Sequence, residues 1–211
     1  MKVCEIFASI QGESSFAGYP CVFVRLTGCN LRCSYCDTAY AYNEGTDIEL
    51  SEILEKVKPY GIKLIEVTGG EPLLQKESYG LIERLLEEGF QVLLETNGSI
   101  SVENVDQRVS VILDIKTPSS SMSNRMFMKN LDLVSKKDDV KFVLGSREDY
   151  EWVKDVMEKH GFSERTNILL SPVFGSLDPA MLARWMVKDG IQARLNLQLH
   201  RYIFGSNRRG V

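Results

Sequence analysis

The sequence lacks any long hydrophobic run. A helix that spans a bilayer needs about 20 consecutive, mostly apolar residues, and no stretch of the 211-residue chain approaches that length. Glu5 interrupts the first apolar residues, so residues 1–7 do not resemble the apolar core of a secretory signal. These absences disfavour a membrane protein and predict a cytoplasmic location.

An excess of positive charge is also missing. The chain has 25 Lys and Arg against 29 Asp and Glu, a formal net charge of -4. Proteins that bind nucleic acid neutralise phosphates with clustered basic side chains, so nucleic acid is not expected as a direct ligand. Linkers, low-complexity tracts and charge blocks are absent as well. Because a chain of this length suits one buried core, the sequence predicts a single domain across residues 1–211.

Cysteine is scarce, and three of the five cysteines are crowded together at Cys29, Cys33 and Cys36. In a reducing compartment, clustered thiols are more typical of metal ligands than of disulfides. Three thiolates are one short of a closed tetrahedral zinc site. The candidates for a fourth ligand, none of them at recognisable zinc-finger spacing, are Cys4, Cys21, His160 and His200. The alternative is a 4Fe-4S cluster, in which a missing fourth thiolate leaves one iron open to bind a reacting molecule.

Hydrophobic periodicity predicts alternating strands and helices. The expected strands are residues 21–27, 62–68, 90–95, 109–115, 140–144, 167–170 and 193–199, and residues 2–9 are either a short strand or an extended arm. The expected helices are residues 47–58, 78–88, 148–160 and 179–188.

This alternation is typical of parallel strands with covering helices. The strands are fewer than the eight of a closed barrel, and residues 99–108 and 118–137 have little helical pattern. The sequence therefore predicts an α/β fold, a partial, open (β/α) barrel of about six parallel strands with reduced helical connections. The three thiols follow a predicted strand directly, and α/β folds place their chemistry at the carboxyl ends of strands.

The spacing Cys29-x3-Cys33-x2-Cys36, with Tyr35 before the third thiol, resembles the motif of radical S-adenosylmethionine (SAM) enzymes. Residues 69–72, Gly-Gly-Glu-Pro, are similar to the superfamily's loop for the SAM amino group. Glycines let the backbone approach a ligand, and a carboxylate pairs with an ammonium group. Alone, this second motif is equally typical of an ordinary Gly-Pro turn. Together the motifs indicate a radical-SAM-type barrel in which the open iron binds SAM.

Further motifs, from about residue 6 onward, resemble the 7-carboxy-7-deazaguanine synthases. They lie at residues 10–13, 25, 36–38, 95–98, 114–116 and 198–200. The resemblance implies a lyase that converts 6-carboxy-5,6,7,8-tetrahydropterin into 7-carboxy-7-deazaguanine with loss of ammonia, on the route to queuosine and other 7-deazapurines. It also implies Mg²⁺, a flavodoxin- or ferredoxin-like one-electron reductant and a homodimer.

The resemblance assigns roles to individual residues. Cys29, Cys33 and Cys36 ligate the cluster, and Thr38 supplies a hard oxygen ligand to Mg²⁺. The expected SAM contacts are Tyr35, Cys36, Asp37, Gly70, Glu71, Asn97, Asp114, Ile115, Lys116 and Ser171. The expected substrate contacts are Ile10, Gln11, Gly12, Glu13, Arg25, Thr68, His200 and Val211. A carboxamide and a carboxylate suit the polar edge of a pterin, and a guanidinium fork suits a carboxylate. No catalytic side chain beyond the cluster and cofactor is expected.

Two rival functions remain at this point. A glycyl-radical-enzyme activating enzyme shares the cluster and the Gly-Gly-Glu-Pro motif, but it gives no reason for the polar residues 11–13 or for His200. A non-catalytic zinc or iron-sulfur module is more remote and needs a fourth protein ligand. Single residues also have structural alternatives, since Arg25 could form a surface ion pair and Asp37 or Thr38 could cap a turn. Residues 118–137 are either a lid or a loop.

Overall fold

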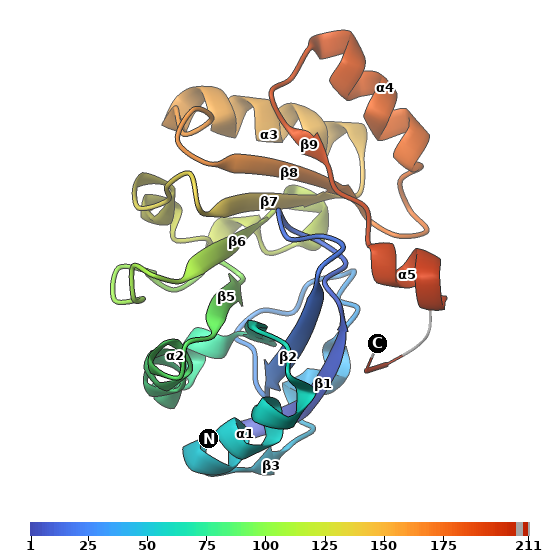
Figure 1. The fold of residues 1–211 in the computed structure, drawn as a ribbon. Coiled ribbons are helices and arrows are strands. Elements are labelled where there is room, and N and C mark those ends of the chain that lie inside the picture. Colours follow the sequence, from blue (N-terminus) through green and yellow to red (C-terminus); the bar gives the residue numbers. More distant parts are fainter. Residues whose placement is uncertain (206–208, 211) are drawn as a thin grey trace.

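One curved sheet organises the fold. A computed structural model describes residues 1–205, 209 and 210, and within them nine strands form a sheet in the order β3-β1-β2-β4-β5-β6-β7-β8-β9 (Figure 1). The strands are β1 (Lys2–Ile10), β2 (Pro20–Leu26), β3 (Thr46–Asp47), β4 (Leu64–Gly69), β5 (Gln91–Thr96), β6 (Ser110–Lys116), β7 (Asp139–Leu144), β8 (Asn167–Pro172) and β9 (Arg194–Leu195). From β2 through β4 to β9 all neighbours are parallel, whereas β1 is antiparallel to β2 and β3. The prediction of an open, mostly parallel α/β fold is confirmed.

Helices connect the strands and bury one face of the sheet. They are α1 (Leu50–Val57), α2 (Glu77–Glu87), α3 (Arg147–His160), α4 (Pro179–Asp189) and the short α5 (Leu199–Phe204). Ile53 and Val57 of α1, and Leu81 and Leu85 of α2, are fully buried in the main core. Their spacing of four places each pair on one helix face. Among the described residues, no helix is both long enough and apolar enough to cross a bilayer.

The other face of the sheet is concave and changes character along the strands. Side chains alternate between the two faces of a strand, so in β4 Leu64, Glu66 and Thr68 share the inner face. Leu64 packs into a small inner apolar cluster with Phe23 of β2 and Leu93 of β5. Glu66 and Thr68, nearer the carboxyl end, are buried polar residues. The barrel therefore has an apolar floor and a polar upper half.

Two connections contain no α-helix, as the weak periodicity predicts. The β5–β6 connection is irregular, and the β6–β7 connection contains the short 3-10 helices Pro118–Ser120, Ser123–Arg125 and Met128–Asp132. The fully buried Asn130 joins the two connections. It accepts a hydrogen bond from Val102 N at 3.0 Å and donates to the carbonyls of Gly98 and Ile100 at 3.3 and 2.8 Å. The Asn130 side chain thus provides hydrogen-bond partners for three backbone groups of a connection that has no helix to pair them.

The last predicted strand is wrong in extent. Residues 193–199 were expected to be extended, but only Arg194 and Leu195 pair with β8. Asn196 N still donates to Leu170 O at 2.9 Å, and the chain then leaves the sheet, because Leu199 N donates to Gly12 O at 2.9 Å. Leu199 begins α5, which covers the open side of the barrel (Figure 1).

The loop from β1 to β2 crosses the concave face. Ser15 N donates to Asp139 Oδ2 at the start of β7 at 2.7 Å, and the Ser15 hydroxyl binds the same carboxylate. Residues 2–9, for which a strand or an arm was expected, form most of β1. The antiparallel turn after β1 carries residues 11–13 inside the barrel.

Candidate active site

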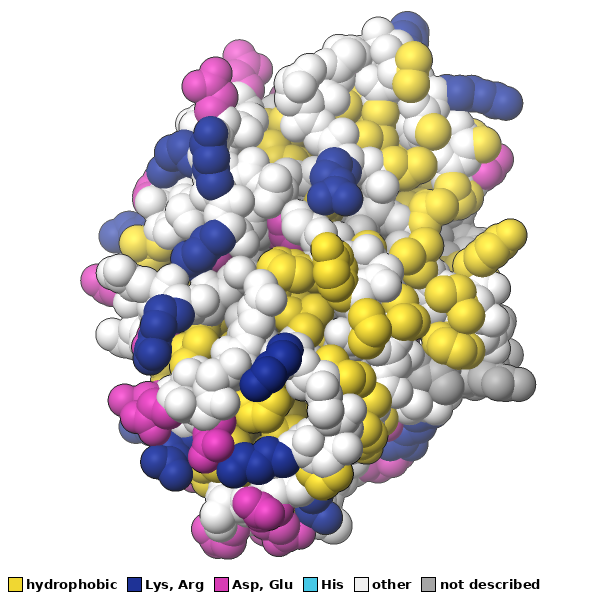
Figure 2. Space-filling view, viewed as in Figure 1, with side chains coloured by type: hydrophobic (Ala, Val, Ile, Leu, Met, Phe, Trp, Pro, Cys, Tyr) yellow, Lys and Arg dark blue, Asp and Glu magenta, His cyan; other side chains and the backbone are white. Residues whose placement is uncertain are grey.

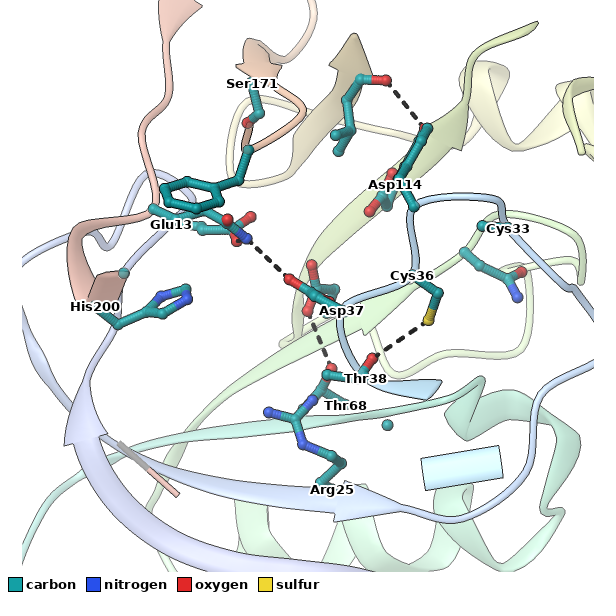
Figure 3. A pocket seen from close by; sticks show the side chains of 18 of the residues that line it. Glu13, Arg25, Cys33, Cys36, Asp37, Thr38, Thr68, Asp114, Ser171 and His200 are labelled. Carbon is teal, nitrogen blue, oxygen red and sulfur yellow. Dashed lines mark hydrogen bonds between the residues drawn. The ribbon is translucent and has the colours of Figure 1, made fainter. Parts of the chain in front are cut away.

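A cavity of about 890 Å³ occupies the polar upper half of the barrel (Figure 3). It brings together most of the residues that the sequence singles out: Ile10, Gln11, Gly12, Glu13, Arg25, Cys29, Cys33, Tyr35, Cys36, Asp37, Thr38, Thr68, Gly70, Asn97, Asp114, Lys116, Ser171 and His200. Glu71 and Ile115 are fully buried and do not line it. Val211 lies outside the described residues.

The three clustered thiols lie on the loop after β2. All are free and half-buried. The Cys29 sulfur accepts from Leu31 N at 3.4 Å and from Asn97 Nδ2 at 3.7 Å, and the Cys36 sulfur lies 3.8 Å from Thr38 Oγ1. Burial raises the pKa of both Cys29 and Cys33. Since metals bind the thiolate form, binding of a metal group at this loop is coupled to proton release.

The thiols suit a cluster better than a single ion. Within residues 1–205 and 209–210, no three Cys, His, Asp or Glu side chains form a group that could hold one metal ion. Zinc requires its sulfur ligands about 2.3 Å from one centre. A 4Fe-4S cluster is a larger object that takes its thiolates on different irons. Three thiols that share one loop and one cavity wall without converging fit that larger group.

The Gly-Gly-Glu-Pro loop packs directly against the thiol loop. A Cβ atom at Gly70 would lie 2.2 Å from Gly28 O and 2.8 Å from Cys29 Cβ. The backbone N–H of Glu71 donates to Gly28 O at 2.8 Å. Glycine is therefore required at residue 70 for the two loops to touch.

The Glu71 carboxylate faces the protein rather than the cavity. It accepts from Leu73 N at 3.0 Å, from Asn97 N at 2.7 Å and from the Thr96 hydroxyl. Burial raises its pKa to about 7, although the N–H groups of Asn97 and Leu73 favour the charged form. The Glu71 carboxylate therefore joins the loop after β4 to the loop after β5 by hydrogen bonds.

Arg25 projects from β2 into the cavity (Figure 3). Its Nε donates to Glu5 Oε1 at 2.8 Å, and its guanidinium lies 5.8 Å from the centre of the Phe7 ring. Glu5 also accepts from the Tyr40 hydroxyl at 2.8 Å. In the part of the chain that the structure describes, no side chain accepts from the two Nη atoms, so the outer edge of the fork faces the cavity.

Gln11 and Glu13 enter the cavity from the β1–β2 loop. Gln11 Oε1 accepts from Glu13 N at 2.8 Å, and Gln11 Nε2 donates to Glu66. The protein therefore engages both ends of this carboxamide. Glu13 Oε1 accepts from Gln198 Nε2 at 2.7 Å, and Lys141 Nζ lies 2.7 Å from Glu13 Oε2. Although burial raises the pKa of Glu13, the Lys141 ammonium holds it below its ordinary value.

The remaining polar residues come from distant segments. The Tyr35 hydroxyl donates to Val143 O at 3.1 Å, and Asn196 Nδ2 donates to Ser171 Oγ at 2.9 Å. Asp37 accepts from Arg201 at 2.9 Å. His200 packs against Gly12 so closely that a Cβ atom at Gly12 would lie 2.3 Å from His200 Nδ1. Burial lowers the pKa of His200.

The prediction of site residues missed three charged strand residues that line the cavity: Glu66, Glu95 and Lys141. A signal for them exists in the strand alternation. Glu66 stands two residues before Thr68, Glu95 two before Asn97, and Lys141 is the polar residue between Val140 and Phe142. A charged residue inside an apolar strand, on the inner face of a barrel, indicates a polar cavity.

Comparison with known proteins identifies the family of this chain. The model of the radical SAM superfamily matches residues 23–175. The 7-carboxy-7-deazaguanine synthase of Chlorobaculum tepidum is 45% identical over 214 residues, covering 100% of this chain and 97% of that protein. The enzyme of the same name from Koribacter versatilis is 40% identical over 228 residues, with 100% of both chains covered.

Among solved structures, the crystal structure of QueE from Escherichia coli is similar, with a TM-score of 0.78 and 93% of both chains covered. Its sequence identity of 20% supports the fold alone. The resemblance found in the motifs is confirmed by the full-length relatives. The chain belongs to the radical SAM superfamily and, within it, to the 7-carboxy-7-deazaguanine synthase family.

Proposed function

We propose that this chain converts 6-carboxy-5,6,7,8-tetrahydropterin into 7-carboxy-7-deazaguanine, with loss of ammonia. The observation that carries the proposal is one cavity lined by three thiols together with a polar set, in which Arg25 is suited to bind a carboxylate and Glu13 to accept from N–H groups. The names of the full-length relatives support the same reaction. The polar wall distinguishes this proposal from an activating enzyme that acts on a protein backbone.

Membership of the radical SAM superfamily implies a 4Fe-4S cluster and SAM. When bound, the cluster and SAM would supply the radical chemistry that removes hydrogen from the substrate. Cys29, Cys33 and Cys36 would hold the cluster, and Asn97 would donate to the Cys29 sulfur.

The chain's own residues would bind SAM along the loops that follow β4, β5 and β6. Gly70 offers backbone, and Asn97 and Asp114 offer an amide and a carboxylate on the cavity wall. Lys116 Nζ lies 3.0 Å from Asp114 Oδ2 and keeps that carboxylate ionised. Tyr35, Asp37 and Ser171 complete the proposed contacts, and Glu71 would act by bracing the loops.

The substrate would be oriented from β1, β2 and α5. The Nη atoms of Arg25 would bind its carboxylate in a bidentate manner. Glu13 would accept from the N–H groups of the aminopyrimidinone ring, and Thr68 and His200 would contact the remaining polar atoms. Gln11 would act mainly through its bond to Glu13 N.

Mg²⁺ at Thr38 is a finer part of the proposal. Thr38 lines the cavity beside the third thiol, and its Oγ1 lies 3.8 Å from Cys36 Sγ. A hydroxyl is a suitable oxygen ligand, and water and substrate would fill the other positions, as Mg²⁺ usually retains several waters. We expect Thr38→Ala to weaken the dependence of activity on Mg²⁺. Activity and Mg²⁺ dependence equal to the wild type would remove Thr38 from the metal site.

The partners are also proposed rather than tested. We expect a cytoplasmic enzyme, a flavodoxin- or ferredoxin-like reductant and a homodimer. Figure 2 shows hydrophobic side chains gathered over the region of α4, β9 and α5, where Met181, Leu195, Tyr202 and Ile203 are exposed. Such a surface is compatible with a contact between two copies.

The function is tested by anaerobic reconstitution. The protein with iron, sulfide, reductant, SAM and Mg²⁺ should yield 7-carboxy-7-deazaguanine from carboxytetrahydropterin, detected by mass spectrometry. The matched control is Cys33→Ala, which removes one cluster ligand. SAM cleavage without the deazaguanine product would contradict the proposed substrate, and a colourless zinc protein would contradict the reaction class.

A further inference from the structure

A buried lysine stands at the centre of the cavity's charges. Lys141 projects from β7, and its side chain is 5% exposed. Its Nζ lies 2.7 Å from Glu13 Oε2 and 3.3 Å from Asp114 Oδ2, and it also pairs with Glu95. These three carboxylates come from the β1–β2 loop, β6 and β5. One ammonium group therefore joins the substrate side of the cavity to the SAM side.

We propose that Lys141 is a positioning residue, which holds Glu13 in place and in the ionised state needed to accept N–H groups of the substrate's aminopyrimidinone ring. This inference rests on the proposed function. It extends that function, because it assigns specificity for a neutral ring edge rich in N–H groups to Glu13 and Lys141 together. Lys141 belongs to none of the sequence motifs.

The same cavity shows what happens to a carboxylate without such a partner. Glu66 on β4 is 3% exposed and binds Gln11, but within the described residues it forms no ion pair. Burial, with the neighbouring Glu95, raises its pKa well above the ordinary value. A buried acid that lacks a counter-ion takes up a proton. Glu13, whose side chain is 17% exposed, is also largely enclosed, and it differs by its contact with Lys141.

Loss of Lys141 would affect Glu13 more than Asp114. Asp114 retains Lys116, whose Nζ is 3.0 Å from its Oδ2. Glu13 would retain the neutral amide of Gln198 at 2.7 Å, and among the described residues it has no second ion-pair partner. Several elements place charged or titratable groups around the pair. They are Arg25 on β2, Glu66 on β4, Glu95 on β5, Asp114 and Lys116 on β6, Asp37 on the thiol loop, and His200 and Arg201 on α5.

A protonated Glu13 would be a poor partner for the substrate. The neutral carboxyl group has one hydrogen that points outward as a donor, so it meets the N–H groups of the ring donor to donor. An unpaired donor in a closed site costs much of the binding free energy. Without Lys141, binding should therefore become weaker as the pH falls, and it should recover when the pH is raised enough to ionise Glu13.

The experiment is calorimetric titration of carboxytetrahydropterin into anaerobic holoenzyme with SAM and without reductant, so that binding is measured and no turnover occurs. The variants are Lys141→Met and Lys141→Arg. The control is Lys154→Met, because Lys154 pairs with Asp189 and Glu151 on the protein surface. Between pH 8 and pH 6, wild type, Lys141→Arg and the control should each change less than about twofold in Kd. For Lys141→Met, Kd should rise by up to about tenfold per pH unit, as one linked proton requires.

The outcomes separate the inference from the proposed function. If wild type binds the pterin and Lys141→Met shows the same flat profile, the role of Lys141 is wrong while the function stands. If wild type binds no pterin at any pH, the proposed function fails and this inference fails with it. If Lys141→Met does not fold, Lys141→Met with Glu95→Gln keeps the cavity's net charge while Glu13 still lacks its ammonium, and the same pH dependence is expected.

Discussion

Replacing Gly70 by alanine tests the contact between the two loops of the active site. An added Cβ would lie 2.2 Å from Gly28 O, 2.7 Å from Gly28 C and 2.8 Å from Cys29 Cβ. All three atoms belong to the segment that carries the first thiol, and two of them are backbone atoms that no rotamer change can move. The thiol loop must therefore shift as a unit.

The size of the shift follows from these distances. Restoring an ordinary carbon–oxygen contact of 3.4 Å from 2.2 Å requires a movement of roughly 1 Å. Overpacking of this kind costs about 1–3 kcal/mol, and each kcal/mol lowers the Tm by about 2–4 °C in a chain of this size. A misplacement of about 1 Å at a reacting group can cost about 100-fold in rate.

Iron content, EPR of the reduced protein and SAM cleavage measure the consequence. We expect Gly70→Ala to unfold at a lower temperature, to bind less iron after reconstitution and to cleave SAM about 100-fold more slowly. The matched control is Gly80→Ala in α2, whose Cβ would meet only Leu50 Cδ1 at 3.7 Å. Alanine favours a helix by about 1 kcal/mol over glycine, so this control should be slightly more stable. Wild-type iron content and Tm in Gly70→Ala would refute the reasoning.

Three further predictions concern Glu5, Glu71 and Asn130. Glu5→Gln should raise the KM for the pterin about tenfold with little change in kcat, because the charged hydrogen bond that orients Arg25 contributes about 1.5 kcal/mol. For Glu71, burial raises the pKa from 4.5 to about 7, so the folded state keeps a proton that the unfolded state loses between about pH 4.5 and 7. Its contribution to the free energy of unfolding should therefore fall by about 3 kcal/mol as the pH rises through that range, measured by urea unfolding of the cluster-free chain. Asn130→Ala should cost about 2–4 kcal/mol, since three backbone groups lose their partner, measured by the same method.

Each of these has a control and an opposing result. Glu52→Gln removes one side of an exposed ion pair and should leave the KM unchanged; an equal KM in Glu5→Gln would show that Arg25 needs no such support. In Glu71→Gln, the free energy of unfolding should not show the fall with rising pH that Glu71 causes in the wild type. If the free energies of wild type and Glu71→Gln change with pH in parallel, the pKa of Glu71 is not raised. Asn43→Ala, at an exposed residue, should cost under about 0.5 kcal/mol, and an equally small cost for Asn130→Ala would contradict the joining role.

Much of the fold could be predicted because its signals are local. The helices at residues 78–88, 148–160 and 179–188 were expected close to the bounds observed, since apolar spacing and terminal glycines act within one element. Asn130 could not be recognised, because a buried amide that joins two irregular connections has no periodic signal. The strand expected at residues 193–199 is shorter than predicted because Gly12 in the β1–β2 loop, 187 residues earlier, accepts a hydrogen bond from Leu199 N away from the sheet.

The sequence by itself determined the family, the cluster motif and many of the polar residues that line the cavity, because the spacing of thiols or glycines within one loop is a property of neighbouring residues. Only the tertiary structure decided which charged side chains of the cavity contact one another. The Gly-Gly-Glu-Pro motif predicts that Glu71 contacts SAM, whereas the fold buries the Glu71 carboxylate between two loops. Lys141 belongs to no motif, yet parallel pairing of β5, β6 and β7 places it among three carboxylates. Ionisation depends on neighbours in space and on burial, and both come from strand pairing across distant parts of the chain.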